Sequence, residues 1–222
     1  PAWGAAAYND REDAPKELGE VSRGFQRKLA DKGWLTLAWP KEHGGLGAGA
    51  MRQLVYNEEM SALRAPGFGG MGVAMVGPTL MLHGADEQRA RFLGPIARNE
   101  IAWCQGFSEP GSGSDLASLQ TRAVRDGDDF IINGQKIWTS GAQRADYCIL
   151  LARTDTEAPK HRGISYFIMD MRSPGITITP LTNMLNSAAF NQMFMDNVCI
   201  PRANLVGELN RGWYVATTTL DF

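Results

Sequence analysis

Apolar side chains recur at helical spacing in the N-terminal part of the chain. Between residues 14 and 34 they fall on one face, and Gly33 follows them as a stop signal. The apolar positions of this segment are Leu18, Val21, Phe25 and Leu29. The pattern predicts a first amphipathic helix over residues 14–34.

Three further segments before residue 101 have the same character. Residues 50–63 repeat the helical spacing, and residues 86–98 do so with two acidic side chains in the first turn, where the helix dipole favours them. Residues 69–82 are rich in Gly and Met and nearly uncharged, which predicts a buried helix that Pro78 either kinks or divides. Residues 1–101 are therefore expected to be helical.

From about residue 102 to residue 207 the pattern changes to short apolar runs rich in Val, Ile, Phe, Tyr and Thr, separated by turn residues. Runs over residues 147–152, 164–169 and 176–179 predict strands. The run Phe130–Ile132 follows an Asp-Gly-Asp-Asp turn and precedes Asn133-Gly134, which is a hairpin signal. Closely spaced antiparallel strands predict a small barrel or sandwich.

Both ends of the chain indicate a piece of a longer protein. The first residue is Pro1, and the segment from Asn210 to Phe222 begins as a helix but contains no helix-stop signal. We therefore expect an α+β multidomain protein whose helical domain (1–101) precedes a β domain (102–207). Residues 208–222 are expected to start a truncated helical domain.

Composition narrows the class of protein. Lys and Arg number 22 against 24 Asp and Glu, so the net charge of −2 supplies no global field for nucleic acid or an anionic membrane. No apolar run approaches the length of a membrane span. The three cysteines, Cys104, Cys148 and Cys199, are isolated, which predicts buried reduced thiols and a cytoplasmic protein. The three histidines have no spacing typical of a metal site, so no metal is expected.

The stretch from Gly106 to Asp115 is a candidate anion site. Gly111 and Gly113 allow close approach to backbone N–H groups, and Ser112 and Ser114 add hydroxyl donors, so the turn could hold a pyrophosphate. It matches neither a Walker loop nor a dinucleotide fingerprint. Taken alone, a Gly-Ser turn of this kind is more often an ordinary polar hairpin loop.

Trp138 is the second candidate. In a β-structure a single tryptophan is more often a core residue than a ligand contact. Thr139 and Ser140 directly after it change this, because an aromatic ring can cover one face of a flavin while neighbouring hydroxyls donate to its polar edge.

Together these stretches resemble the signatures of the acyl-CoA dehydrogenase family. The loop from Pro40 to Gly47 resembles the family's Pro-x-x-x-Gly-Gly-x-Gly element, and Gly84 to Gln88 resembles its Gly-x-x-x-Gln helix. The segment from Val198 to Trp213 resembles the approach to the family's C-terminal domain. The resemblance implies a helical N-terminal domain, a middle β-barrel domain that binds flavin and acyl-CoA, and a C-terminal helical bundle that this chain only begins.

The resemblance also implies an FAD cofactor and its contacts. The residues that match flavin contacts of the family are Gln105, Phe107, Ser108, Gly113, Ser114, Trp138, Thr139 and Ser140. Ser114 also matches a substrate contact, as do Leu220 and Asp221 at the start of the bundle. Thr139, Gly141 and Gln105 depart from the commonest residues of the family, which suggests a subfamily.

The implied reaction is α,β-dehydrogenation of an acyl-CoA thioester, with hydride transfer to flavin N5 and with electron-transfer flavoprotein as electron acceptor. The catalytic base is expected beyond Phe222, and Glu109 does not match it. A homodimer or homotetramer is expected. The alternatives are an acyl-CoA oxidase, nitroalkane oxidase or flavin monooxygenase of the same fold, and a non-catalytic subunit that completes a heteromeric site.

Overall fold

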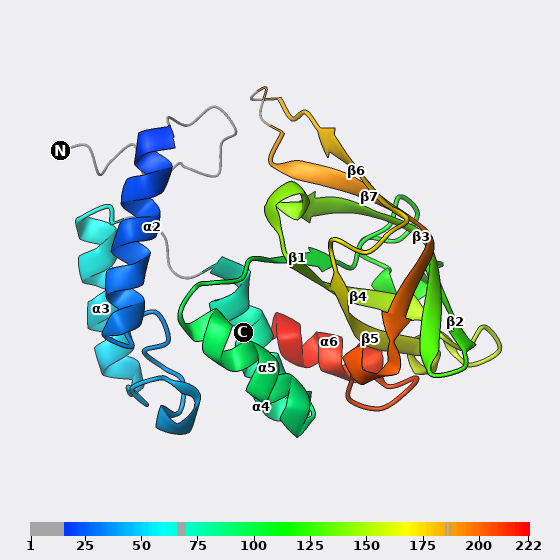
Figure 1. Ribbon diagram of the computed structural model, residues 1–222, viewed down its shortest axis with the longest axis horizontal. Coiled ribbons are helices and arrows are strands. Elements are labelled where there is room, and N and C mark those ends of the chain that lie inside the picture. The colour runs from blue at the N-terminus through cyan, green and yellow to red at the C-terminus, as the bar shows by residue number, and fades with distance from the viewer. Residues whose placement is uncertain (1–15, 66–69, 185, 187) are drawn as a thin grey trace.

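The computed structural model describes residues 16–65, 70–184, 186 and 188–222, and the side chains from residue 20 onward within them. Figure 1 shows a pair of helices, a group of shorter helices and a curled sheet in chain order. The helical N-terminal region followed by a largely antiparallel sheet domain confirms the predicted fold class.

The predicted helices are present with bounds close to those expected. They are α2 (Lys16–Asp31), α3 (Ala50–Ala62), the π-helix η2 (Gly72–Val76), α4 (Gly77–His83) and α5 (Asp86–Ala97). Positions 14, 15 and 69, which the predicted helices included, lie outside the described residues.

Three helices end in the same way, with one residue in the left-handed conformation. That residue is Gly33 after α2 (φ 66°), Arg64 after α3 (φ 48°) and Asn99 after α5 (φ 54°). After α2, Gly33 N–H donates to Ala30 O and Trp34 N–H to Leu29 O, both at 2.8 Å, which is a Schellman motif. The glycine that the sequence indicated as a stop therefore satisfies the last carbonyls of its helix.

Pro78 lies where the helical run changes from one type of winding to another. The helical run passes through the five-residue π-helix η2 and continues as α4, where Pro78 occupies the first turn. Thr79 Oγ1 donates to Met75 O at 2.8 Å, and Trp39 Nε1 donates to Val73 O at 3.1 Å. Wider π-helical winding and these side-chain bonds accommodate the missing proline N–H.

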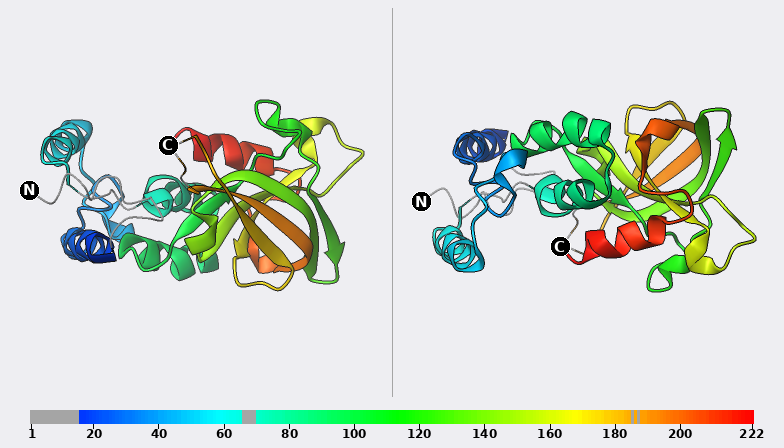
Figure 2. Two further views of the ribbon diagram at one scale, coloured as in Figure 1. Left: turned by 90° about the horizontal axis from the view of Figure 1, so that it is seen from above. Right: turned by 90° about the horizontal axis from the view of Figure 1, so that it is seen from below.

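The helices α2 and α3 lie side by side and apart from the sheet, whereas α4, α5 and α6 (Gly212–Leu220) lie against it (Figures 1 and 2). Leu29, Leu35 and Met60 form the small core of the first pair. Three apolar side chains of α3 are exposed, namely Met51, Leu54 and Val55.

The sheet has eight strands in the order β6-β7-β3-β2-β4-β5-β8, with β1 also paired to β4. They are β1 (Trp103–Gly106), β2 (Arg122–Asp126), β3 (Asp129–Ser140), β4 (Tyr147–Arg153), β5 (Ile164–Asp170), β6 (Ile176–Leu181), β7 (Phe190–Pro201) and β8 (Leu205–Val206). The pairs β1–β4 and β2–β4 are parallel and the others antiparallel.

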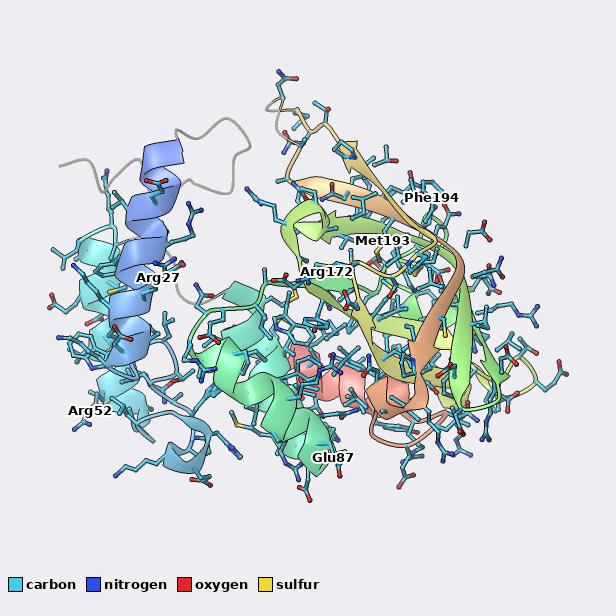
Figure 3. All side chains as sticks on the ribbon, viewed as in Figure 1. Arg27, Arg52, Glu87, Arg172, Met193 and Phe194 are labelled. Carbon is cyan, nitrogen blue, oxygen red and sulfur yellow. The ribbon has the colours of Figure 1, made fainter. Side chains whose placement is uncertain are left out.

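The predicted strands at β4 and β5 are buried on both faces. Ile149 and Tyr166 face the helices, whereas Leu150 and Phe167 face the interior of the curled sheet. Across that interior the rings of Phe130 and Phe167 lie 5.0 Å apart. Two-sided burial explains why these strands are continuous apolar runs without alternation. On β7, buried Met193 and exposed Phe194 follow the one-sided pattern (Figure 3).

The hairpin predicted after Phe130–Ile132 is wrong. Strand β3 continues through Asn133 and Gly134 to Ser140. The register shifts here because β7 holds Asp196 and Asn197 where β3 holds only Asn133, and Asn133 Oδ1 accepts the Asn197 N–H at 2.9 Å. The Asn-Gly pair therefore serves a β-bulge, and the hairpin turn is the Asp-Gly-Asp-Asp segment before it.

Candidate functional site

The two stretches singled out in the sequence lie against each other. Ile137 N–H donates to Ser108 O at 2.9 Å, which joins the middle of β3 to the segment that follows β1. Ser108 is half-buried and Trp138 is exposed. A glycine-rich turn and an exposed aromatic ring thus belong to one region of the surface.

The glycine-rich turn is closed by its own hydrogen bonds. Glu109 and Ser112 exchange two backbone hydrogen bonds of 2.9 and 3.0 Å, and Ser112 Oγ donates to Asp115 O at 2.8 Å. Gly113 and Ser114 are exposed, and among the described residues their backbone N–H groups have no acceptor. A Cβ added at Gly113 would meet nothing within 4 Å, so a ligand could approach this backbone.

Trp138 adopts a conformation that is rare for a tryptophan. Its φ is 62°, and 61% of its surface is exposed. The cause is a bulge, because β3 holds Ile137 and Trp138 where β7 holds only Gln192. The Phe190 ring meets the indole edge to face at 6.2 Å. Exposure combined with left-handed backbone is typical of a residue retained for a site and not for packing.

Beneath Trp138 lies a cluster of buried polar groups that includes atoms without partners. Asn191 is fully buried, and its Nδ2 donates to Thr139 O at 3.0 Å and to Gln143 Oε1 at 2.6 Å. Among the residues that the structure describes, Thr139 Oγ1, Gln143 Nε2 and Asn191 Oδ1 have no hydrogen-bond partner. Unpaired buried polar atoms are uncommon and often mark a position where a water or a ligand binds. Ser140, the next residue of β3, is exposed.

A buried ion pair connects the two stretches. Lys136 Nζ lies 2.8 Å from Glu109 Oε1 and 3.0 Å from Phe107 O. Lys136 is 0% exposed and Glu109 8% exposed. Burial acts to raise the pKa of Glu109, but the Lys136 charge and several hydrogen bonds outweigh it and lower that pKa below its ordinary value. Complete burial lowers the pKa of Lys136, which Glu109 partly opposes.

The remaining predicted site residues are either less exposed than Trp138 or separate from the glycine-rich turn. Gln105 is half-buried on β1, and the buried ring of Phe107 packs edge to face on Tyr166 at 5.9 Å. Leu220 and Asp221 are exposed at the end of α6. In the part of the chain that the structure describes, no hydrogen bond or ring contact joins them to the glycine-rich turn.

One connection does run from α6 toward the site. Thr219, the residue before Leu220, donates from Oγ1 to Tyr166 Oη at 3.2 Å. Tyr166 is the residue on which Phe107 packs. The Thr79 hydroxyl of α4 lies 2.9 Å from the same Thr219 hydroxyl, so this buried network also fixes α6 against α4.

Sequence reasoning missed Lys136 and Asn191. A signal for Lys136 was available, because it is in phase with the inward-facing Phe130 and Ile132 of the same strand. A lysine at an inward position requires a buried acceptor, and Glu109 is that acceptor. Nothing local marked Asn191, since its partners are on β3 and on η4 (Ala142–Arg144).

The thiols only partly follow the prediction. Cys104 and Cys148 are fully buried, but Cys199 is exposed on β7, with Sγ 3.5 Å from Asp129 Oδ2. The prediction of three buried thiols is therefore wrong at Cys199, because outward-facing positions of β7 are open to solvent.

Two cavities lie elsewhere on the molecule. One of about 560 Å³ separates η1 (Lys41–His43) from α5, and one of about 250 Å³ lies beside Arg125 and Arg202. Neither is lined by a predicted site residue. Within the described ranges no group of three or more His, Cys, Asp and Glu could hold a metal ion.

The residues at the junction of the two stretches fit FAD. The open N–H groups at Gly113 and Ser114 suit a pyrophosphate, while the exposed Trp138 ring and the exposed Ser140 suit a flat heterocycle with polar edges. None of the helices in the described ranges is long and apolar enough to cross a membrane.

Comparison with known proteins gives matches along nearly the whole chain. Residues 4–100 match the family model of the acyl-CoA dehydrogenase N-terminal domain, and residues 104–198 match that of the middle domain. Acyl-CoA dehydrogenase FadE34 of Mycobacterium tuberculosis is 44% identical over 97% of this chain and 29% of FadE34. Acyl-CoA dehydrogenase IpdE1 of the same organism is 41% identical over 93% of this chain and 54% of IpdE1.

Solved structures also match nearly the whole of this chain. The G363A variant of the Tcur3481-Tcur3483 steroid ACAD superimposes with a TM-score of 0.88 at 40% identity, over 100% of this chain and 57% of that chain. The ChsE4-ChsE5 complex of Mycobacterium tuberculosis gives 0.84 at 41% identity, over 99% of this chain and 56% of that chain. The chain thus spans about half the length of these structures.

Proposed function

Because the chain belongs to the acyl-CoA dehydrogenase family, we propose that the protein is an FAD-dependent enzyme that dehydrogenates an acyl-CoA thioester between its α and β carbons. One observation carries the proposal. The exposed, left-handed Trp138 and the open glycine-rich turn are joined through the 2.9 Å hydrogen bond from Ile137 to Ser108.

Different residues of this chain would bind different parts of the cofactor. Gly113 and Ser114 bind the pyrophosphate through backbone and hydroxyl donors, and Trp138 covers the ring system. Thr139 and Ser140 supply hydroxyl donors at its polar edge, while Gln105, Phe107 and Ser108 line the other side. When bound, FAD supplies a two-electron acceptor at N5 for hydride from the β carbon.

The α proton requires a separate base, which we propose lies beyond Phe222. Glu109 does not suit this role, because it is buried and paired with Lys136, and its lowered pKa makes it a weaker base. Ser114, Leu220 and Asp221 are proposed as the substrate contacts of this chain. We also propose that the helical domain ends at residue 101, that the β domain ends at residue 207, and that the protein is cytoplasmic.

The relatives support a proposal for the acyl group and the partners. One similar structure is that of a steroid ACAD, so we propose a bulky, steroid-like acyl-CoA as the first substrate class, with electron-transfer flavoprotein as acceptor. A homo-oligomer is the simplest assembly. A second candidate is a subunit that completes a heteromeric site, favoured because two similar structures carry the names of two components each.

An FAD titration followed by flavin fluorescence tests the cofactor. Wild type is expected to give saturable quenching that Trp138→Ala weakens. Trp34→Ala is the matched control, since Trp34 is also about half exposed (42%) but lies beside α3. Equal behaviour of the two variants would contradict the proposed flavin position.

Turnover of the full-length protein separates the enzyme classes. A dehydrogenase is expected to reduce electron-transfer flavoprotein with an acyl-CoA and to consume little oxygen, whereas an oxidase would consume oxygen in proportion to substrate. A chain that binds FAD only after mixing with a second subunit would favour the heteromeric alternative.

A further inference from the structure

We propose that Lys136 and Glu109 are positioning residues that set the flavin-facing orientation of Trp138 relative to the glycine-rich turn. The inference rests on the proposed function for the identity of the ligand, but its geometry is that of the protein alone. Both side chains are buried, since Lys136 is 0% and Glu109 8% exposed. Any effect on a ligand must therefore pass through other residues.

The pair connects four separate parts of the chain. Lys136 Nζ donates to Glu109 Oε1 at 2.8 Å and to Phe107 O at 3.0 Å. Glu109 also accepts the backbone N–H of Gln120 at 2.6 Å and that of Thr121 at 2.9 Å. One lysine and one carboxylate thus tie β3, the end of β1, the opening of the glycine-rich turn and the approach to β2.

Both ends of the pair lie next to proposed flavin contacts. Lys136 is the last residue in register before the bulge that carries Trp138, opposite Met193 of β7. Glu109 forms the backbone bridge with Ser112 that closes the turn before Gly113. The hydrogen bond from Ile137 to Ser108 lies between the two ends. A shift of the ion pair would therefore move the indole and the turn relative to each other.

Stability alone does not account for an ion pair at this place. Removing two charges from water is costly, and apolar residues of similar size often stabilise a fold equally well or better. Close to the pair, the interior of the curled sheet holds apolar side chains such as Ile132 and Met193. An ion pair fixes the register of β3, because only one alignment of this strand places Lys136 beside Glu109.

The test follows Trp138 directly, in full-length protein labelled with fluorotryptophan. The fluorine resonance of Trp138 is assigned by its disappearance in Trp138→Phe. The central variant is the double substitution Lys136→Met and Glu109→Gln, which removes both charges, leaves neither unpaired and keeps the side-chain sizes. Asn204→Leu is the control for general destabilisation, since Asn204 is buried and donates to Ile168 O at 2.8 Å outside this region.

In the double variant the Trp138 resonance is expected to move or to split, and FAD affinity to fall about tenfold or more. Asn204→Leu should lower the melting temperature and leave the Trp138 resonance in place. An unchanged resonance and unchanged FAD affinity in a folded double variant would overturn the inference. If wild type fails to bind FAD while the resonance still moves, the positioning role stands and the proposed cofactor does not.

Discussion

Ile137 donates its backbone N–H to the carbonyl oxygen of Ser108 at 2.9 Å, and this contact joins two stretches that are far apart in the sequence. On one side of it lies the glycine-rich turn, and on the other the bulge with Trp138. The contact explains why a turn and a strand end, each ambiguous alone, form a single candidate site.

The left-handed backbone at Trp138 predicts an unusual order of stability. Trp138→Gly should be more stable than Trp138→Ala by about 1 kcal/mol, because a left-handed conformation is strained for any residue with a Cβ. Urea unfolding of both variants measures the difference. At exposed Val124 in β2 the order should be reversed, with Ala above Gly. Equal stability of the two Trp138 variants would show that the strain is absent.

The bulge at Gly134 predicts that a methyl group is not tolerated there. Its φ is 152°, and an added Cβ would lie 2.7 Å from Thr121 Cα, so Gly134→Ala should lower the free energy of unfolding by more than about 2 kcal/mol. Gly24→Ala in α2 is the control. It has nothing within 4 Å of an added Cβ and should gain about 0.5–1 kcal/mol from helix propensity. A neutral Gly134→Ala would contradict the observed approach of Thr121.

Replacing buried Asn191 should destabilise the protein more than replacing its neighbour Gln192. Asn191→Leu leaves Thr139 O and Gln143 Oε1 without their donor, so the free energy of unfolding should fall by about 2–4 kcal/mol. Gln192→Leu removes a half-exposed amide whose bond to Gln135 is replaceable by water, and should cost less than about 1 kcal/mol. Denaturant unfolding compares the two, and similar losses would argue against the buried cluster.

The lowered pKa of Glu109 predicts how the ion pair depends on pH. Because the folded-state pKa lies below the unfolded value of about 4.3, the stabilisation is complete above that value and is lost as pH falls through the folded-state pKa. Glu109→Gln should therefore be clearly less stable than wild type at neutral pH. The difference should shrink on acidification, since protonated Glu109 also leaves Lys136 without a counter-charge. A difference independent of pH would argue against an ionised Glu109.

The exposure of Cys199 predicts selective thiol chemistry. In the native protein one of the three thiols, Cys199, should react with a disulfide reagent, and Cys199→Ser should abolish this reaction. Desolvation and the nearby Asp129 carboxylate raise the pKa of Cys199, so the rate should keep rising as pH passes the usual thiol value of about 8.5. Rapid reaction of more than one thiol would show that the sheet interior opens.

Sequence alone determined the features that depend on neighbours along the chain. Helical spacing identified α2, α3 and α5, because side chains on one face of a helix are three or four residues apart. Gly33 marked the end of α2, since a left-handed stop needs no partner from elsewhere. The apolar runs at β4 and β5 were equally recognisable.

Tertiary structure decided what depends on distant partners. Asn133 and Gly134 have the signature of a hairpin, but pairing with Asn197 makes them part of a bulge. The chain places Lys136 in an inward phase, yet only the fold supplies Glu109, and no local pattern indicates the left-handed Trp138. The physical reason is that strand register and the burial of charge are set by segments far apart in the sequence, whose contacts form only when the sheet closes.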